Sequence, residues 1–242
     1  MAERIETLII HLARATARRA QVDGLLAGSP YPAHVISAVE GCMLSAEHTE
    51  RVLSERPLFK PRYPFPLNPG ELGCFLSHRT AWQLIVDKDL EAGLVLEDDV
   101  ALLDGFAEAA AFAAEHVSEL GYIQFQTRQI LECRSLVKKG NLRILQPAVT
   151  PLRTSAQMVS NAAARKLLAL TEQIDRPVDT FLQSHWHTGL KPCCVAPSGV
   201  EDRTAQSGGS TISTRQPLSE KLGREWKRLR YRRSVKRRSK DV

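Results

Sequence analysis

The chain has 242 residues, 43% hydrophobic and 25% charged, a length that allows one large domain or two small ones. These proportions exclude a fibrous or a wholly disordered protein. The net charge of +6 is unevenly placed: residues 220–242 hold eleven Lys or Arg and three Asp or Glu, and the rest of the chain is at about −2. The basic character therefore belongs to the C-terminal segment.

The cysteines and the N-terminal residues indicate a reducing compartment. The five cysteines are odd in number and lack the paired spacing of a zinc or redox motif, which favours free thiols. Glu3 and Glu6 precede only a short apolar run, so no secretion signal is expected. No stretch approaches the ~20 apolar residues that cross a bilayer. We therefore expect a cytoplasmic location.

Strands and helices are expected to alternate from the start of the chain. Residues 7–12 show the pattern of a short buried strand, and residues 14–26 that of a helix. Residues 29–69 are rich in proline and are predicted to be irregular, apart from a second strand at 35–39 and a mobile loop at 59–69.

The centre of the chain combines a clear helix start with a buried strand. Pro69 opens a predicted helix that runs to about residue 86. Residues 93–96 are apolar on both faces, as in a central parallel strand. A further helix is expected over residues 103–117.

The last third of the chain continues the alternation. We expect a strand at 122–126, a hairpin around 138–141, an extended segment at 155–160, a helix capped by Asn161 that runs to 170, a helix from 178 to about 186 after Pro177, and a strand at 191–196. This order predicts an α/β fold with a mostly parallel central sheet, in which ligands bind at the carboxyl ends of strands. We expect one domain over residues 1–215 and a basic amphipathic tail over 216–242.

Three carboxylates follow the strand at 93–96. Isolated buried carboxylates are costly, and a hard, oxygen-rich site suits Mn²⁺ or Mg²⁺ held between the protein and a diphosphate. Alternation along an extended chain sends Glu97 and Asp99 to one side and Asp98 to the other, so we expect Glu97 and Asp99 to bind the metal. An equally weighted alternative is that these acids only solvate the strand end or cap the next helix.

Two blocks of sequence resemble a known family. Residues 70–78, GELGCFLSH, then Trp82, then residues 93–100, GLVLEDDV, resemble the signature of glycosyltransferase family 25, the lipopolysaccharide-type galactosyltransferases and their relatives. Leu12, Arg18, residues 38–41 and residues 177–179 resemble other blocks of that family, and the likeness covers about residues 7–213. His11 stands where the family usually has Asn, and Gln157 and Met158 stand where an aromatic is common.

The resemblance implies a GT-A-like nucleotide-sugar-binding fold and a UDP-sugar donor, often UDP-galactose. The sugar would be transferred with inversion to a hydroxyl of a glycan or lipid-linked saccharide acceptor, and the acidic block would hold Mn²⁺ or Mg²⁺ against the UDP phosphates. The donor-binding residues that it implies are Leu12, Arg18, Glu71, Ser77, His78 and Asp98. The alternative function is a catalytically inactive scaffold at a membrane surface or on nucleic acid.

Inverting transfer needs a general base near the attacking hydroxyl and positive charge near the leaving diphosphate. Asp179, at a predicted helix start, is our candidate base, with a helix-dipole acid as the alternative. Arg18 is either a phosphate ligand at the first βα turn or a surface arginine. His185 and His187 diverge on a helix and are poor candidates for a shared metal.

The basic tail has an amphipathic pattern of its own. Leu218, Leu222, Trp226 and Leu229 fall on one helical stripe, and Lys and Arg fill the rest. Such a helix suits an anionic membrane surface, so we expect residues 218–240 to hold the enzyme peripherally on the inner face of the membrane. Nucleic acid is the less favoured partner, and a solvated, disordered tail is the remaining alternative.

Overall fold

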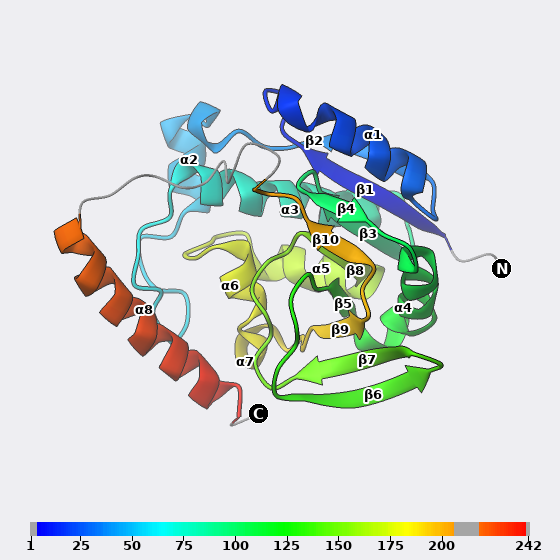
Figure 1. Ribbon diagram of the computed structural model, residues 1–242. Coiled ribbons are helices and arrows are strands. Elements are labelled where there is room, and N and C mark those ends of the chain that lie inside the picture. Colours follow the sequence, from blue (N-terminus) through cyan, green and yellow to red (C-terminus); the bar gives the residue numbers. More distant parts are fainter. Residues whose placement is uncertain (1–3, 206–217, 241–242) are drawn as a thin grey trace.

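An eight-stranded sheet forms the centre of the computed structural model, which describes residues 4–205 and 218–240 (Figure 1). The strand order is β2-β1-β3-β8-β5-β9-β7-β6. The strands are β1 (Ile5–His11), β2 (Ala33–Ser37), β3 (Ala92–Glu97), β5 (Tyr122–Phe125), β6 (Cys133–Lys139), β7 (Leu142–Pro147), β8 (Ala156–Ser160) and β9 (Cys193–Ala196). A small second sheet pairs β4 (Val100–Leu102) with β10 (Val200–Asp202).

Most strands of the large sheet point the same way. β1 is parallel to β2 and β3, and β9 is parallel to β5. β8 is antiparallel to β3 and β5, and β7 is antiparallel to β9 and β6. Only β8 and β7 therefore run against the common direction, and the predicted α/β fold with a mostly parallel sheet is confirmed.

Helices cover both faces of this sheet. They are α1 (Arg19–Gly28), α2 (Ala46–Val52), α3 (Pro69–Asp87), α4 (Phe106–Leu120), α5 (Asn161–Leu170), α6 (Val178–Leu182), α7 (His185–Thr188) and α8 (Leu218–Arg238), with short 3₁₀ turns η1 (Thr16–Arg18) and η2 (Gly41–Met43). Leu94 and Leu96 of β3 pack with α1 and α4, whereas Val95 packs with α3, α5 and α6. This alternation buries β3 on both faces, as its apolar sequence predicted.

The N-terminus of α3 is fixed by a capping box. The Asn68 Oδ1 atom accepts a hydrogen bond from the Glu71 amide at 2.9 Å, and a Glu71 carboxylate oxygen accepts one from the Asn68 amide at 2.9 Å. A Cβ atom on Gly73 would lie 2.4 Å from the Val39 carbonyl oxygen, so the chain after β2 packs directly on this helix. The contact with Val39 places the start of α3 beside the carboxyl end of β2.

Several predicted elements differ in detail. The first helix begins at Arg19, after the 3₁₀ turn η1, and the predicted helix over 178–186 is two short helices, α6 and α7. The cap of α5 is Ser160, whose Oγ accepts from the Ala163 amide at 3.2 Å. Asn161 instead donates to the carbonyl oxygen of Leu90 at 2.9 Å, which ties α5 to the chain before β3.

The predicted mobile loop at 59–69 is held by contacts. The side chain of Arg176 is fully buried, and its guanidinium lies 3.5 Å from the centre of the Phe59 ring. The same group donates to the carbonyl oxygens of Phe59 and Pro61 at 3.0 and 3.2 Å. These contacts contradict a mobile loop in the first half of the segment.

Helix α8 docks on the body along one face. Tyr231 and Val235 are buried, and Lys236 pairs with Glu132 at 2.8 Å. Trp226 and Leu229, on the predicted apolar stripe, are 60% and 45% exposed. The side chains of Leu218 and Leu222, and the expected domain boundary after residue 215, lie outside the described part of the chain.

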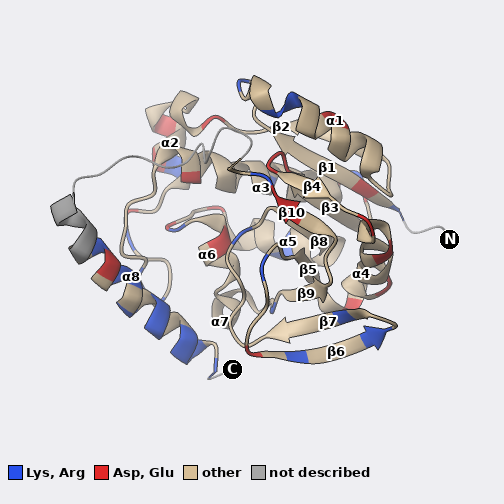
Figure 2. Ribbon diagram, viewed as in Figure 1, with Lys and Arg blue, Asp and Glu red and all other residues tan. Residues whose placement is uncertain are grey.

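Figure 2 shows Lys and Arg concentrated along α8. Within the described ranges, no helix is long and apolar enough to cross a membrane. All five cysteines are free thiols, as expected.

Candidate functional site

Two adjoining cavities open where β1 and β3 end. The turn cavity, of about 290 Å³, lies at the first βα turn and is lined by Leu12, Arg18, Ser77, His78 and Asp98, among others. The acid cavity, of about 360 Å³, is lined by Tyr63, Glu71, Asp99 and Asp179, among others. Cys74 and Glu97 line both cavities. A ligand that fills the turn cavity would therefore lie next to the acid cavity.

Asp98 organises the chain after β1. Its Oδ1 atom accepts from the Arg18 guanidinium at 2.5 Å, and its Oδ2 atom accepts from the Leu12 amide at 3.4 Å. The Nδ1 atom of His11 lies 2.7 Å from the same Oδ2, so the Nδ1–H of His11 donates a hydrogen bond to this carboxylate. Arg18 is only 7% exposed, which rules out the surface-arginine interpretation.

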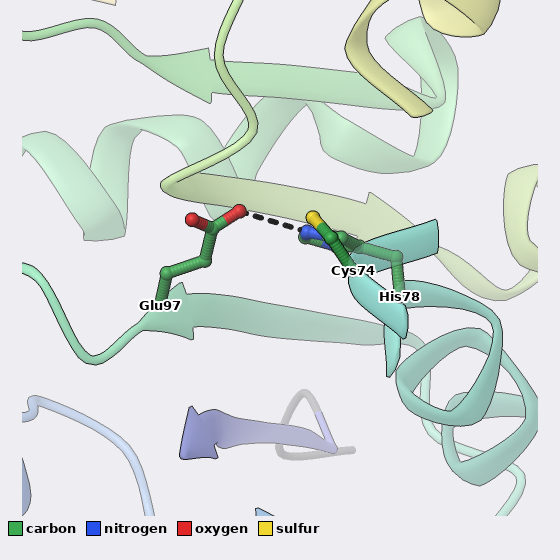
Figure 3. Close-up of side chains that lie close together, drawn as sticks. All are labelled: Cys74, His78 and Glu97. Atoms are coloured by element: carbon green, nitrogen blue, oxygen red, sulfur yellow. Dashed lines mark hydrogen bonds and ion pairs between the residues drawn. The ribbon is translucent and has the colours of Figure 1, made fainter. Parts of the chain in front are cut away.

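A chain of hydrogen bonds fixes the tautomer of His78. The Tyr122 hydroxyl donates to the Gln157 oxygen, which leaves the Gln157 amide nitrogen 2.9 Å from His78 Nδ1. An amide nitrogen only donates, so Nδ1 is the acceptor and the ring proton is on Nε2. His78 Nε2 then donates to Glu97 Oε1 at 2.9 Å (Figure 3). β5, β8 and α3 thus orient the carboxylate at the end of β3.

Glu97 is held as a carboxylate. Burial alone would raise its pKa, but the hydrogen bonds from His78 and from Thr154 Oγ1, at 3.0 Å, outweigh burial and lower the pKa. Both hydrogen bonds end on the same oxygen, Oε1. The negative charge of Glu97 is therefore present at neutral pH at the boundary of the two cavities.

Asp99 carries a buried oxygen without a partner. Its Oδ2 atom accepts from Thr204 Oγ1 at 3.0 Å, whereas Oδ1 has no hydrogen bond to any described residue. Burial, and next the charge of Glu97, raise the pKa of Asp99 to about 6. A buried acceptor of this kind is costly unless a cation or donor meets it. Carboxylate oxygens are ligands that hard divalent cations prefer, so Glu97 and Asp99 fit such a cation.

A second group of possible ligands is less suited to a hard cation. Cys74, His78 and Glu97 have ligand atoms within 4.8 Å of one another (Figure 3), the only such group of three found in the part of the chain that the structure describes. Burial, then the nearby Glu97, raise the pKa of the Cys74 thiol well above its usual range, and both ring nitrogens of His78 are engaged. This group therefore serves to orient Glu97.

Asp179 faces the acid cavity from the start of α6. Its Oδ1 atom accepts from the amide and hydroxyl of Thr180 at 2.6 and 3.1 Å, and its Oδ2 atom from the Arg153 amide at 3.4 Å. Burial raises its pKa in spite of these bonds, and the charge of Glu97 adds to the rise. A carboxylate with a raised pKa is a stronger base than an ordinary surface acid.

The structure brings most of the expected residues together. Five of the six donor-binding candidates line the turn cavity, and Glu71 lines the acid cavity with Glu97, Asp99 and Asp179. The Ser77 hydroxyl donates to the Gly73 carbonyl at 2.7 Å and accepts from the Val39 amide at 2.8 Å, so it supports the cavity wall. The functional roles of these residues stay predictions.

Several residues of the site could not be identified from the sequence. Thr204 reaches Asp99 because β10 pairs with β4, about 100 residues earlier in the chain. Arg153, which has a positive φ of 82°, forms an ion pair with Asp202, and its backbone amide donates a hydrogen bond to Asp179. Tyr63 enters the acid cavity from a segment that was expected to be mobile. The His187 ring stacks on the Phe59 ring with ring centres 3.8 Å apart, and neither His185 nor His187 belongs to a group of three possible metal ligands among the described residues.

The fold and the site define an α/β protein. Two cavities, one of them lined by carboxylates, open at the ends of its strands, the edge at which such sheets bind ligands. The family model described as glycosyltransferase family 25 (LPS biosynthesis protein) matches residues 4–182. The chain belongs to this family, and the resemblance seen in the sequence is confirmed.

Three relatives illustrate the range of the family. The chain is 31% identical over 187 residues to procollagen galactosyltransferase 1 of Danio rerio and 30% identical over 186 residues to procollagen galactosyltransferase 2 of Homo sapiens. It is 34% identical over 188 residues to a protein of Rattus norvegicus named probable inactive glycosyltransferase 25 family member 3. Each match covers 73% of this chain but only 29–32% of the relative, so the chain spans about a third of the length of these relatives.

Proposed function

We propose that this chain is a metal-dependent glycosyltransferase that moves a sugar from a UDP-sugar to a hydroxyl of a glycan or lipid-linked saccharide, with inversion. The observation that carries the proposal is the buried Oδ1 of Asp99, which has no partner among the described residues and lies beside Glu97, where the two cavities meet. Galactose is the expected sugar, because two relatives are named galactosyltransferases.

The turn cavity would take the UDP part of the donor. Arg18 and the Leu12 amide lie at its wall, fixed by Asp98. Because Glu97 lines both cavities, a diphosphate that ends beside Glu97 would direct its sugar into the acid cavity. Glu97 and Asp99 would hold Mn²⁺ or Mg²⁺, which supplies positive charge to the leaving diphosphate.

Asp179 would act as the general base in the acid cavity. It accepts the proton of the acceptor hydroxyl while the hydroxyl oxygen bonds to the anomeric carbon. The bond from that carbon to the UDP oxygen breaks, and UDP leaves with the electron pair. The hydrogen bonds from Thr180 and the Arg153 amide hold the carboxylate in place for this step.

Binding of UDP with Mn²⁺ tests the proposal directly. Calorimetry should show Mn²⁺-dependent UDP binding to the wild type and none to Asp99→Asn, which keeps the shape of the side chain but not its charge. Asp104→Asn removes an exposed acid a few residues along the chain that lines neither cavity, and it should bind as the wild type does. Equal UDP affinity in wild type and Asp99→Asn would remove Asp99 from the metal site.

An inactive scaffold is the second candidate function, because the rat relative is named as probably inactive. A scaffold has no need of clustered acids, whereas Glu97, Asp99 and Asp179 line one cavity here. A screen of UDP-sugars for Mn²⁺-dependent transfer or hydrolysis separates the two functions. Mn²⁺-dependent UDP binding without turnover of any UDP-sugar would favour the scaffold.

The exposed face of α8 suggests where the protein works. Trp226 and Leu229 point away from the docked face, and the Arg230 guanidinium lies 4.6 Å from the Trp226 ring centre. An exposed aromatic among basic residues suits an anionic membrane surface. We propose a cytoplasmic protein, peripheral on the inner face of the membrane, with nucleic acid as the rival partner.

A further inference from the structure

Helix α8 lies outside the residues matched by the family model, which end at 182. It nevertheless packs on residues 59–66, the segment that carries Tyr63 into the acid cavity. In Figure 1, α8 runs alongside the chain that connects α2 and α3. A helix beyond the family-matched region therefore borders the proposed site of transfer.

Tyr231 makes the central contact between α8 and this segment. It is 9% exposed, and its ring centre lies 5.5 Å from that of Tyr63 in an edge-to-face arrangement of 86°. Its hydroxyl accepts a hydrogen bond from the buried Arg176 guanidinium at 3.3 Å. Arg176 in turn donates to the carbonyl oxygens of Phe59 and Pro61. Tyr231 thus contacts Tyr63 directly and the preceding residues through Arg176.

A second set of contacts lies on the other side of Tyr63. Its ring packs edge-to-face on Phe65, with ring centres 5.6 Å apart. The guanidinium groups of Arg224 and Arg228 lie 4.7 and 5.7 Å from the centre of the Phe65 ring. Residues of α8 thus hold the segment both before and after the side chain that reaches the cavity.

Tyr63 shares the acid cavity with Asp179 and Glu71. An aromatic ring offers an apolar face to a sugar ring, and the proposed base lies in the same cavity. We propose that α8 is a positioning element: through Tyr231 it holds residues 59–66 so that Tyr63 forms the acceptor wall of the acid cavity. The inference rests on the proposed function, since it takes this cavity as the acceptor site.

The test compares Tyr231→Ala with Trp226→Ala, which truncates an aromatic residue on the exposed face of the same helix. Tyr231→Ala should raise the KM for a soluble acceptor by roughly tenfold, as expected for loss of an aromatic contact, and leave the KM for the UDP-sugar within about twofold. The proposed role of Trp226 is to contact a membrane, so with a soluble acceptor and no vesicles present Trp226→Ala should leave both constants unchanged. Tyr231→Phe keeps the ring and should behave nearly as the wild type.

Limited trypsin cleavage after Arg62 provides a readout that does not depend on turnover. Cleavage there should be faster in Tyr231→Ala than in Trp226→Ala, with the melting temperature of each recorded. Unchanged cleavage would overturn the positioning role, and an equal rise in the donor and acceptor KM values would overturn the acceptor assignment. If the wild type transfers no sugar, the proposed function fails, and cleavage alone then decides whether α8 positions the segment.

Discussion

At the scale of single residues, Asp99 shows how burial and a like charge prepare a carboxylate for a cation. Its Oδ1 atom has no partner among the described residues, and burial together with Glu97 raises its pKa to about 6. The folded, metal-free protein therefore holds an ionised Asp99 at neutral pH at a cost in stability. A bound cation would remove that cost.

This cost predicts a specific dependence of stability on pH. The pKa of Asp99 is raised to about 6 in the folded protein, so at low pH the folded state binds this proton more tightly than the unfolded state does. The stabilisation that results is lost as the pH rises through about 6. Asp99→Asn stays neutral and escapes this loss. In EDTA, the melting temperature of the variant minus that of the wild type should therefore increase between pH 5 and pH 7.5. A constant difference would show that Asp99 titrates normally.

Asp179 gives the second prediction at this scale. Asp179→Asn keeps an oxygen that can accept from Thr180 and from the Arg153 amide, so the fold should be retained. Loss of the base should lower kcat by a factor of about 10²–10⁴, with the KM for the donor little changed. Steady-state kinetics with the UDP-sugar check this. Near-normal turnover would leave Asp179 only its role at the start of α6.

The grouping of the three acids was only partly predictable from the sequence. Glu97 and Asp99 line the acid cavity together, as alternation along an extended chain predicted. The strand ends at Glu97, however, so Asp98 and Asp99 lie in the turn that follows it, and Asp98 accepts from Arg18. The partner of Asp99, Thr204, was not predictable. Its position depends on pairing between strands about 100 residues apart, which no local pattern encodes.

At the scale of elements, helix and strand positions followed from local signals, and their ends followed from capping. The Pro69 start of α3 was predicted because the proline and the capping acid are adjacent in sequence. The cap of α5 was placed one residue late, because Ser160 and Asn161 are both good capping residues. Only the fold shows that the Asn161 side chain donates instead to the carbonyl oxygen of Leu90, in the chain before β3. The break between α6 and α7 carried no proline or glycine to mark it.

The hydrogen-bonded chain from Tyr122 to Glu97 joins four elements and gives a prediction about stability. Gln157→Leu would leave the Tyr122 hydroxyl and His78 Nδ1 without partners in the core. Each unsatisfied buried group costs about 1–3 kcal/mol, so the free energy of unfolding should fall by roughly 2–6 kcal/mol, measured by urea denaturation. Tyr122→Phe strands only the Gln157 oxygen and should cost less. If Gln157→Leu lowered the free energy of unfolding by no more than Tyr122→Phe does, the inferred hydrogen-bond chain would be contradicted.

At the scale of the whole molecule, charge is separated between the body and α8. The body is slightly acidic and the last 23 residues carry a net charge of +8. The sequence predicted this and the amphipathic helix, but not that α8 would dock through Tyr231 and Val235. Docking of that face leaves Trp226 and Leu229 outward, together with Arg230 and Arg233. Deletion of α8 would disturb both faces, so substitutions on the outer face are the cleaner test.

If the outer face binds an anionic membrane, Arg230→Gln with Arg233→Gln should weaken sedimentation with phosphatidylserine-containing vesicles. Each basic residue near the headgroups contributes about 1 kcal/mol, so two substitutions should lower the binding constant about thirtyfold. Added salt should weaken binding of the wild type, because the Debye length falls from about 10 Å at 0.1 M to about 3 Å at 1 M. Trp226→Ala should weaken it further by removing the apolar anchor.

The matched control for this charge change is Lys138→Gln with Arg143→Gln, which removes two exposed cations from the β6–β7 hairpin. This variant should sediment as the wild type does, because the proposed binding depends on the outer face of α8 and not on the net charge of the protein. Equal losses in both double variants would indicate attraction without a defined surface. Tight, salt-sensitive binding of RNA or DNA that ignores Trp226→Ala would favour nucleic acid, since phosphate contacts depend on charge alone.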